Sequence, residues 1–118
     1  MPVGSGKCVF CEIAGGRGRA EALYRDEMVT AFRDIRPKAP VHVLVIPNEH
    51  IESVAELEED HGPLLGRIIR VANEVARSQG IADGGYRLVI NRGRHGGQTV
   101  DHLHLHLLGG RRMGWPPG

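Results

Sequence analysis

The stretch from His102 to Leu108 constrains the fold of this chain most strongly, because histidine and leucine alternate along it with period two. Successive side chains of a β-strand point to opposite faces of the sheet. The alternation therefore predicts a strand whose leucines face the core, while His102, His104 and His106 share the other face. At a rise of roughly 3.3 Å per residue the outer two histidines stand about 13 Å apart, so one metal ion does not easily bind all three.

Two other interpretations of this histidine face compete at this point. Neighbouring histidines at i and i+2 can converge on one zinc ion, which would make the chain a metallohydrolase, but a third and a fourth ligand are missing nearby. A solvated strand face that carries histidines is the usual explanation for a single histidine. Three histidines in strict alternation favour a functional cluster instead.

The remaining patterns predict an α+β fold. Strands are expected at 22–25 and 28–32, which form a hairpin, at 42–46, closed by Pro47, and at 86–91, paired with the histidine strand across a glycine-rich loop. Apolar residues at helical spacing predict one long helix over about 60–79. Asp60 is its expected N-cap, Pro63 lies in its first turn and Gly80 stands at its exit.

Length and charge narrow the classes of function. The chain has 118 residues, of which 41% are hydrophobic, so a single domain over 1–118 is expected. The 15 basic and 14 acidic side chains nearly cancel, and no dense basic cluster indicates a nucleic-acid partner. The stretch Met1–Lys7 lacks a signal-peptide pattern, and no apolar run is long enough for a membrane span. We expect a cytoplasmic protein without a membrane partner.

Two short motifs add candidate chemistry. In the segment Gly96-Gly97-Gln98-Thr99-Val100, glycines permit positive φ and consecutive N–H groups can form an anion cradle, although a plain turn is the commoner meaning. Cys8 and Cys11 form a Cys-x-x-Cys motif, whose thiols are available for metal binding or redox work. No βαβ pattern supports the redox alternative, and a structural disulfide is the weaker interpretation.

The stretch His102-Leu-His104-Leu-His106-Leu-Leu resembles the histidine triad pattern, in which histidines alternate with apolar residues. The chain is identified as a member of the Hint (histidine triad nucleotide-binding) branch of the histidine triad (HIT) family, from Cys8 onward. Four further segments carry the resemblance: Asp34-Ile-Arg-Pro-Lys-Ala-Pro-Val-His42, Val45-Ile-Pro-Asn-Glu-His50, Gly96-Gly-Gln and the tail Leu108-Gly-Gly-Arg-Arg-Met-Gly-Trp-Pro-Pro-Gly118.

The resemblance implies an architecture. It predicts the HIT-like fold, a five-stranded antiparallel sheet with one long helix and a short N-terminal helix, with a core at about 8–110 and a tail at 111–118. It also implies a homodimer whose two sheets join into ten strands. In that dimer Trp115 would reach toward the active site of the partner, although packing of Trp115 on its own chain is the alternative.

The resemblance also implies an activity. Family members are nucleoside phosphoramidases, hydrolases that split the P–N bond of purine nucleoside 5'-phosphoramidates through a nucleotidyl-histidine intermediate. His104 would be the nucleophile, with its Nδ1–H held by an acceptor such as a backbone carbonyl of the same strand. His106 would protonate the leaving amine and contact the phosphate, His42 would support the triad, and His102 would face away toward a metal or a supporting hydrogen bond.

Nucleotide contacts follow from the same resemblance. Asp34 would bind the ribose hydroxyls, Asn91 the phosphate or ribose side, and Gly97, Gln98 and Thr99 the phosphate. The apolar walls of the base pocket are expected to be Phe10, Ile13, Phe32 and Ile35. Any of these polar or apolar side chains could instead be ordinary structural residues, and the choice between adenine and guanine stays open.

A structural zinc site is the last implication. Cys8, Cys11, His50 and His102 would supply four ligands with no open position, and two free thiols are the alternative. Two rival functions also stay open: a nucleotide-binding interaction module with vestigial catalysis, and a Fhit-like dinucleoside polyphosphate hydrolase. The latter should lack the Trp-Pro-Pro-Gly tail.

Overall fold

The computed structural model describes residues 8–118, so the stretch 1–7, for which no signal peptide is expected, lies outside it. The helices are α1 (Val9–Ala14), α2 (Gly62–Ser78) and α3 (Gly93–Gly96), with two 3-10 turns, η2 (Val54–Glu56) and η3 (Glu59–His61). The strands are β1 (Ala22–Arg25), β2 (Val29–Arg33), β3 (Val41–Pro47), β4 (Tyr86–Ile90) and β5 (Leu105–Gly109). Among these described residues no helix is both long and apolar enough to cross a membrane.

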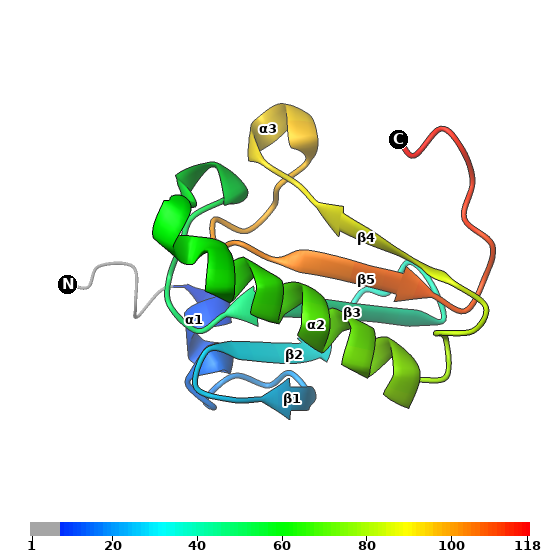
Figure 1. Ribbon diagram of the computed structural model, residues 1–118, viewed down its shortest axis with the longest axis horizontal. Coiled ribbons are helices and arrows are strands. Elements are labelled where there is room, and N and C mark those ends of the chain that lie inside the picture. The colour runs from blue at the N-terminus through cyan, green and yellow to red at the C-terminus, as the bar shows by residue number, and fades with distance from the viewer. Residues whose placement is uncertain (1–7) are drawn as a thin grey trace.

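The five strands form one antiparallel sheet in the order β1-β2-β3-β5-β4, and α2 lies across one face of it (Figure 1). The short helix α1 packs on the opposite face, against β2 and β3. The expected α+β class, with one long helix and a short N-terminal helix, is confirmed. The hairpin and the pairing of the last two strands across the glycine-rich loop are confirmed as well.

Alternation along the strands divides the apolar residues between two cores. Leu103, Leu105 and Leu107 lie on the α2 side, at most 2% exposed. They meet the buried stripe of α2, whose residues are Leu64, Ile68, Val71, Ala72, Val75 and Ala76. The α1 side holds a smaller cluster of Phe10, Ile13, Phe32, Leu44 and Ile46. The leucines therefore face the larger core, as the period-two pattern predicts.

The start of the long helix differs from its prediction. Asp60 is not the N-cap, because it lies in the 3-10 turn η3 and α2 begins only at Gly62, with His61 in the cap position. Pro63 does occupy the first turn, and Gly80 follows the helix with a φ of +77°. Three consecutive residues before the helix thus form a tighter turn that hydrophobic periodicity cannot distinguish from an α-helix.

The histidine strand is also shorter than expected. β5 begins at Leu105 and ends at Gly109, whereas the alternation predicts a strand from 102. The preceding residues leave the ladder because Leu103 N–H donates to the carbonyl of Ile51, at 2.6 Å. His102 consequently lies beside the exit of β3, where its ring meets Pro47 rather than a strand neighbour.

Candidate active site and metal centre

The three alternating histidines lie on the α1 side of the sheet, but they are not solvated. His102 is fully buried, His104 is 5% exposed and His106 is half-buried. Within the sheet His106 stands between its register partners Leu44 of β3 and Val89 of β4. A solvated strand face is therefore excluded for these histidines.

His104 has one ring nitrogen committed to the backbone. Its Nδ1 lies 2.7 Å from the carbonyl oxygen of His102, and a carbonyl can only accept, so Nδ1 carries the hydrogen and donates it. The neutral ring then holds its lone pair at Nε2. The ring of Phe10 packs edge-on against His104 with centroids 5.2 Å apart, which restricts its orientation. The expectation of a backbone carbonyl acceptor agrees with this contact.

His42 and His106 form a relay that determines the tautomers of both rings. The N–H of Lys38 donates to Nδ1 of His42 at 3.0 Å, so Nε2 of His42 carries the hydrogen. That Nε2 donates to Nδ1 of His106 at 2.9 Å, which leaves the hydrogen of His106 on Nε2. Burial, and then the neighbouring His104 and His42, lower the pKa of His106 to about 4. Burial likewise lowers the pKa of His42, against the opposing effect of Asp34.

An apolar hollow of about 610 Å³ opens beside His104. The four side chains expected in the base pocket all line it: Phe10, Ile13, Phe32 and Ile35. Ile35 is 84% exposed, so it forms the rim, whereas the other three are buried in the wall. His104 and His106 line the same hollow, so its apolar space reaches the ring whose Nε2 holds a lone pair.

A second hollow of about 440 Å³ also borders His106. Among the expected phosphate and ribose contacts, Asp34, Asn91, Gly97 and Thr99 line it. The backbone of Gly97 has a φ of +82°, a conformation that favours glycine at this turn. The carboxylate of Asp34 lies 3.4 Å from Nε2 of His42. These groups thus gather where His42 and His106 meet.

Gln98 does not join them. Its side-chain amide donates to the carbonyls of Glu52 and Val100, and its oxygen accepts from the N–H of Gly93. All three bonds brace the glycine-rich loop, and Gln98 lines a different hollow, with Glu52 and Arg92. Both amide hydrogens of Gln98 are thus engaged by backbone carbonyls, and its expected contact with the phosphate stays a prediction.

Trp115 lies apart from both hollows within the described residues. Its ring is 81% exposed and sits under the guanidinium of Arg87, 5.8 Å from the ring centroid. Arg87 also donates to the carbonyl of Gly114 at 2.8 Å, which ties the tail to β4. The expectation that Trp115 reaches a partner subunit stays a prediction.

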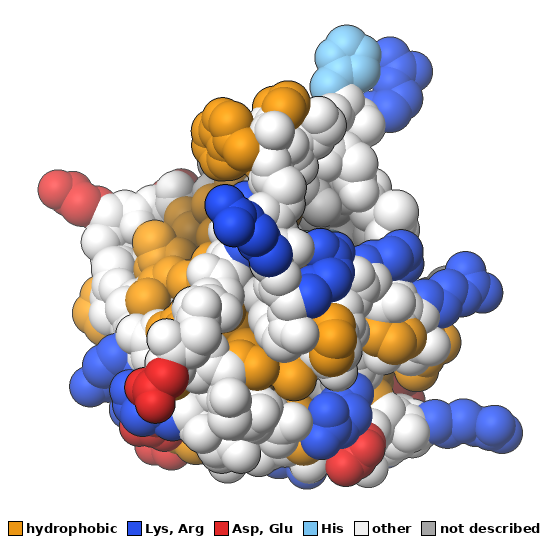
Figure 2. Space-filling model, turned by 90° about the vertical axis from the view of Figure 1, so that its right-hand side faces the viewer, with side chains coloured by type: hydrophobic (Ala, Val, Ile, Leu, Met, Phe, Trp, Pro, Cys, Tyr) orange, Lys and Arg blue, Asp and Glu red, His pale blue; other side chains and the backbone are white. Residues whose placement is uncertain are grey.

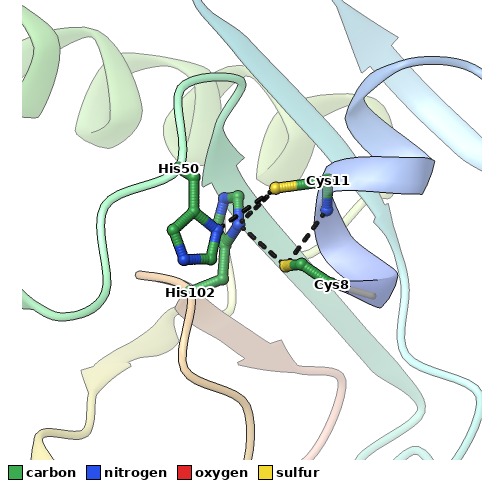
Figure 3. A group of neighbouring side chains, drawn as sticks. All are labelled: Cys8, Cys11, His50 and His102. Carbon is green, nitrogen blue, oxygen red and sulfur yellow. Dashed lines mark hydrogen bonds between the residues drawn. The ribbon is translucent and has the colours of Figure 1, made fainter. Parts of the chain in front are cut away.

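Four further side chains converge at the other end of the histidine segment. Cys8 and Cys11 of the α1 region face His50, beyond β3, and His102 (Figure 3). Their ligand atoms all lie within 4.8 Å of one another, so the cluster can hold a metal ion. This is the same set of four that the sequence resemblance implies.

The geometry of this cluster suits a tetrahedral ion. Nε2 of His102 lies 2.9 Å from the carbonyl of Pro47 and donates to it, so the lone pair of Nδ1 faces the sulfurs. Nδ1 of His102 is 3.4 Å from Sγ of Cys8, and Nδ1 of His50 is 3.2 Å from Sγ of Cys11. Zinc bonds of about 2.3 Å to sulfur and 2.0 Å to nitrogen separate such atoms by about 3.5 Å.

Without a cation, burial favours the neutral forms of Cys11 and His102 in this cluster. Burial, and then the Cys8 thiol, raise the pKa of the Cys11 thiol to about 11. Burial lowers the pKa of His102 to about 4. A bound metal cation favours the thiolates and the neutral imidazoles, which are its ligands, so the donor set fits a resident metal.

Comparison with known proteins identifies the family. Residues 7–114 match the family described as "Scavenger mRNA decapping enzyme C-term binding". The purine nucleoside phosphoramidase of Escherichia coli (strain K12) is 49% identical over 106 residues, which cover 90% of this chain and 89% of that protein. The crystal structure of a HIT family hydrolase from Legionella pneumophila Philadelphia 1 superposes with a TM-score of 0.92 at 48% identity, covering 95% of this chain and 100% of that one.

The chain belongs to the histidine triad (HIT) family. The resemblance inferred from the sequence is thus confirmed, including the Hint branch and the Cys-x-x-Cys motif. One of these relatives is named a phosphoramidase and the other a hydrolase, and this histidine triad protein is a hydrolase of the same family. The 14 kDa zinc-binding protein of Zea mays is 52% identical over 112 residues, 93% of this chain and 87% of that protein.

Sequence reasoning missed part of the lining of this histidine triad site. Leu44 lines the apolar hollow and Lys38 the second one, while Arg36 lines both. Leu44 was detectable, because it shares a strand face with His42 at period two. No pattern singles out Arg36 and Lys38, because charged residues in a proline-containing loop are most often solvated.

Proposed function

We propose that this histidine triad hydrolase cleaves the P–N bond of purine nucleoside 5'-phosphoramidates through a nucleotidyl intermediate on His104. The observation that carries the proposal is the contact of His104 Nδ1–H with the carbonyl of His102, which leaves the Nε2 lone pair beside the apolar hollow. An unprotonated imidazole nitrogen is a competent nucleophile near neutral pH. The phosphoramidase from Escherichia coli supports the reaction class.

The apolar hollow suits a nucleobase. Phe10 and Phe32 form an edge-to-face pair with centroids 5.4 Å apart, and together with Ile13 and Ile35 they present apolar surface to a ring. Asp34, which lines both hollows, would accept hydrogen bonds from the ribose hydroxyls. The α-phosphate would then lie between His104 and His106, next to the N–H groups of the loop at Gly97 and Thr99.

In the first step Nε2 of His104 attacks phosphorus and the P–N bond to the amine breaks. His106 presents Nε2–H to this site, and the phosphoryl anion beside it would favour the doubly protonated ring, with a pKa above the value of about 4 that burial gives it without substrate. In that form Nδ1 also carries a hydrogen, so the hydrogen bond that Nδ1 accepts from His42 in the free protein is given up. That ring donates the proton that the departing nitrogen requires. In the second step neutral His106 accepts a proton from water, which attacks the phosphorus and frees His104 together with the nucleotide.

Cys8, Cys11, His50 and His102 would hold a structural zinc ion, since four protein ligands leave no open position. The zinc-binding relative from Zea mays supports the identity of the metal. When bound, the ion supplies rigidity rather than a reactive position. The residues of this chain that depend on it are those of α1 and the backbone at His102.

The test is turnover of adenosine 5'-phosphoramidate by the purified protein and by His104→Ala, with zinc content measured on the same samples. We expect the variant to lose at least about 10³-fold in kcat while retaining zinc. Equal rates in the two proteins would overturn the nucleophile. Absence of zinc after preparation without chelators would overturn the metal assignment but leave the reaction standing.

A further inference from the structure

The two hollows of the active site differ in which histidines they contain. His104 lines the apolar hollow only, whereas His106 lines both. Thr99 is also shared, so the two spaces meet at the place proposed for the α-phosphate. A substrate bound there with its base in the apolar hollow extends its other end toward the second hollow.

The geometry of displacement at phosphorus indicates what the second hollow could bind. The attacking and departing atoms lie roughly in line on opposite sides of the phosphorus. If His104 attacks from the apolar hollow, the amine would depart on the side of His106, toward the hollow that His104 does not line. The second hollow would then receive the leaving amine beyond the phosphate contacts at Gly97 and Thr99.

The lining of this subsite is cationic at its mouth. Arg36 and Lys38 contribute two exposed cations, and Asp34 is the single carboxylate among its lining residues. The carboxylate is already engaged, because it accepts from the N–H of Arg36 at 2.8 Å and faces His42. Figure 2 views the end of the sheet where β3 begins, and Lys and Arg side chains gather there more than Asp and Glu.

The loop that carries these cations is braced. Nζ of Lys38 donates to the carbonyl of Arg36 at 2.8 Å, and Arg111 donates to the carbonyl of Lys38 at 2.9 Å. The N–H of Lys38 is also the donor that sets the tautomer of His42. The backbone of this loop and the ammonium of Lys38 are thus held in place, and the ammonium keeps further hydrogens for a ligand.

We propose that Arg36 and Lys38 select phosphoramidates whose amine carries an anionic group, a carboxylate or a phosphate. The inference rests on the proposed function and names the substrate class of the same site. The anion takes no part in the bond changes: the P–N bond to the amine breaks, the bond to Nε2 of His104 forms, and His106 supplies the proton. The cations act on binding and orientation of the departing half.

The experiment compares adenosine 5'-phosphoramidates of three amines: glycine, glycinamide and O-phosphoethanolamine. Glycinamide is the neutral match of glycine, and O-phosphoethanolamine replaces the carboxylate with a phosphate. The kcat/KM of each is measured with the wild-type protein and with the double variant Arg36→Gln/Lys38→Gln. For each protein, the kcat/KM of each anionic adduct is divided by that of the glycinamide adduct. Comparing this ratio between the wild type and the variant cancels the different intrinsic reactivities of the amines.

We expect the double variant to lose about 3- to 10-fold in kcat/KM on the two anionic adducts relative to glycinamide, because exposed charge pairs contribute modestly. Added salt should shrink the wild-type preference, since the screening length falls to about 3 Å at 1 M. The control is Arg70→Gln/Arg77→Gln, which removes the same charge from exposed positions of α2 on the other face of the sheet. It should leave every ratio unchanged.

The outcomes separate the two proposals. A selective loss on one anionic adduct identifies that anion as the ligand, and a loss on both supports recognition of either. Unchanged ratios in the Arg36/Lys38 variant, or an equal change in the α2 control, would overturn the leaving-group subsite while the phosphoramidase activity stands. A wild-type protein that cleaves none of the three adducts overturns the proposed function and this inference with it.

Discussion

The histidines of this site differ in which ring nitrogen carries the hydrogen. The carbonyl of His102 takes the hydrogen of His104 Nδ1, and the carbonyl of Pro47 takes that of His102 Nε2. Through His42, the N–H of Lys38 places the hydrogen of His106 on Nε2. One motif thus holds a lone pair at Nε2 of His104, a lone pair toward the cysteines at Nδ1 of His102 and a donor at Nε2 of His106, because each ring meets a different partner.

The depressed pKa of His106 predicts an acid-sensitive fold. Its pKa is about 4 in the folded protein and 6.5 ordinarily, so between these values the unfolded chain binds a proton that the folded chain refuses. The contribution of neutral His106 is complete above pH 6.5 and is lost as the pH falls toward 4. Urea unfolding between pH 7 and pH 4 should therefore show a steeper loss of stability for the wild type than for His106→Gln. Parallel curves would contradict the depressed pKa.

The sequence predicted the hydrogen-bond partner of His104 but not those of Gln98. A carbonyl partner for His104 was predictable, because a histidine can reach the backbone of its own strand. The engagement of Gln98 was not predictable, since its amide can bond a loop carbonyl as easily as a phosphate. Only the fold around Glu52 decides between those two partners.

Among the elements, α1 connects the metal cluster to the proposed base pocket. It has six residues, and Sγ of Cys8 caps it by accepting the N–H of Cys11 at 3.3 Å. The same helix presents Phe10 and Ile13 to the apolar hollow. Helices shorter than about 12 residues are marginal in isolation, so α1 depends on its anchors.

Removal of the metal should therefore loosen the nucleotide site. We expect Cys8→Ser/Cys11→Ser to lose zinc and to bind AMP at least about 5-fold more weakly, within the usual range of coupling between sites. Hydrogen exchange over 9–14 should rise in the variant and in chelator-treated wild type. Isothermal titration with AMP measures the affinity. Equal AMP affinity with and without zinc, together with unchanged exchange over 9–14, would exclude the anchoring role.

The α2 side of β5 should bear most of the stability. Leu107 is fully buried in the larger core, so Leu107→Ala is expected to cost about 2–5 kcal/mol of unfolding free energy. Val9→Ala, at a side chain 53% exposed, should cost no more than about 0.5 kcal/mol. Chemical denaturation gives both values. A loss below 1 kcal/mol for Leu107→Ala would mean that the site collapses around the cavity, since buried leucines ordinarily cost more.

Patterns of period two and 3.6 predicted every strand and the long helix, but not their ends. The first residues of the histidine segment leave the ladder for Ile51, and η3 precedes α2, because both ends are decided by tertiary hydrogen bonds. The same reasoning applies to α3, a short helix inside what reads as a glycine loop.

At the scale of the whole molecule, association is the main expectation still untested. β4 is an edge strand of the sheet, and the tail with Trp115 lies beside it through Arg87. We expect a dimer in which the two sheets join, with light scattering giving twice the 12.9 kDa chain mass. Trp115→Ala should then lower turnover while leaving the mass of the dimer unchanged. A monomer at micromolar concentration would contradict this arrangement.

The sequence predicted the arrangement of the site well where the residues lie on strands. Strand register places His42 and His106 side by side as expected. The Cys2His2 cluster also comes together as expected, but α1 and the loop residues next to β3 and β5 supply its four side chains. A single domain over 1–118 stays a prediction. The cationic subsite at Arg36 and Lys38 was not foreseen, because its meaning depends on the position of a loop relative to His106.

The central claim is that His104 carries the nucleotide during turnover. Alkaline quenching of the protein with adenosine 5'-phosphoramidate preserves an acid-labile P–N adduct, and tandem mass spectrometry locates it. We expect AMP on His104, and no adduct in His104→Ala. AMP on a different residue, or full turnover by His104→Ala, would contradict it.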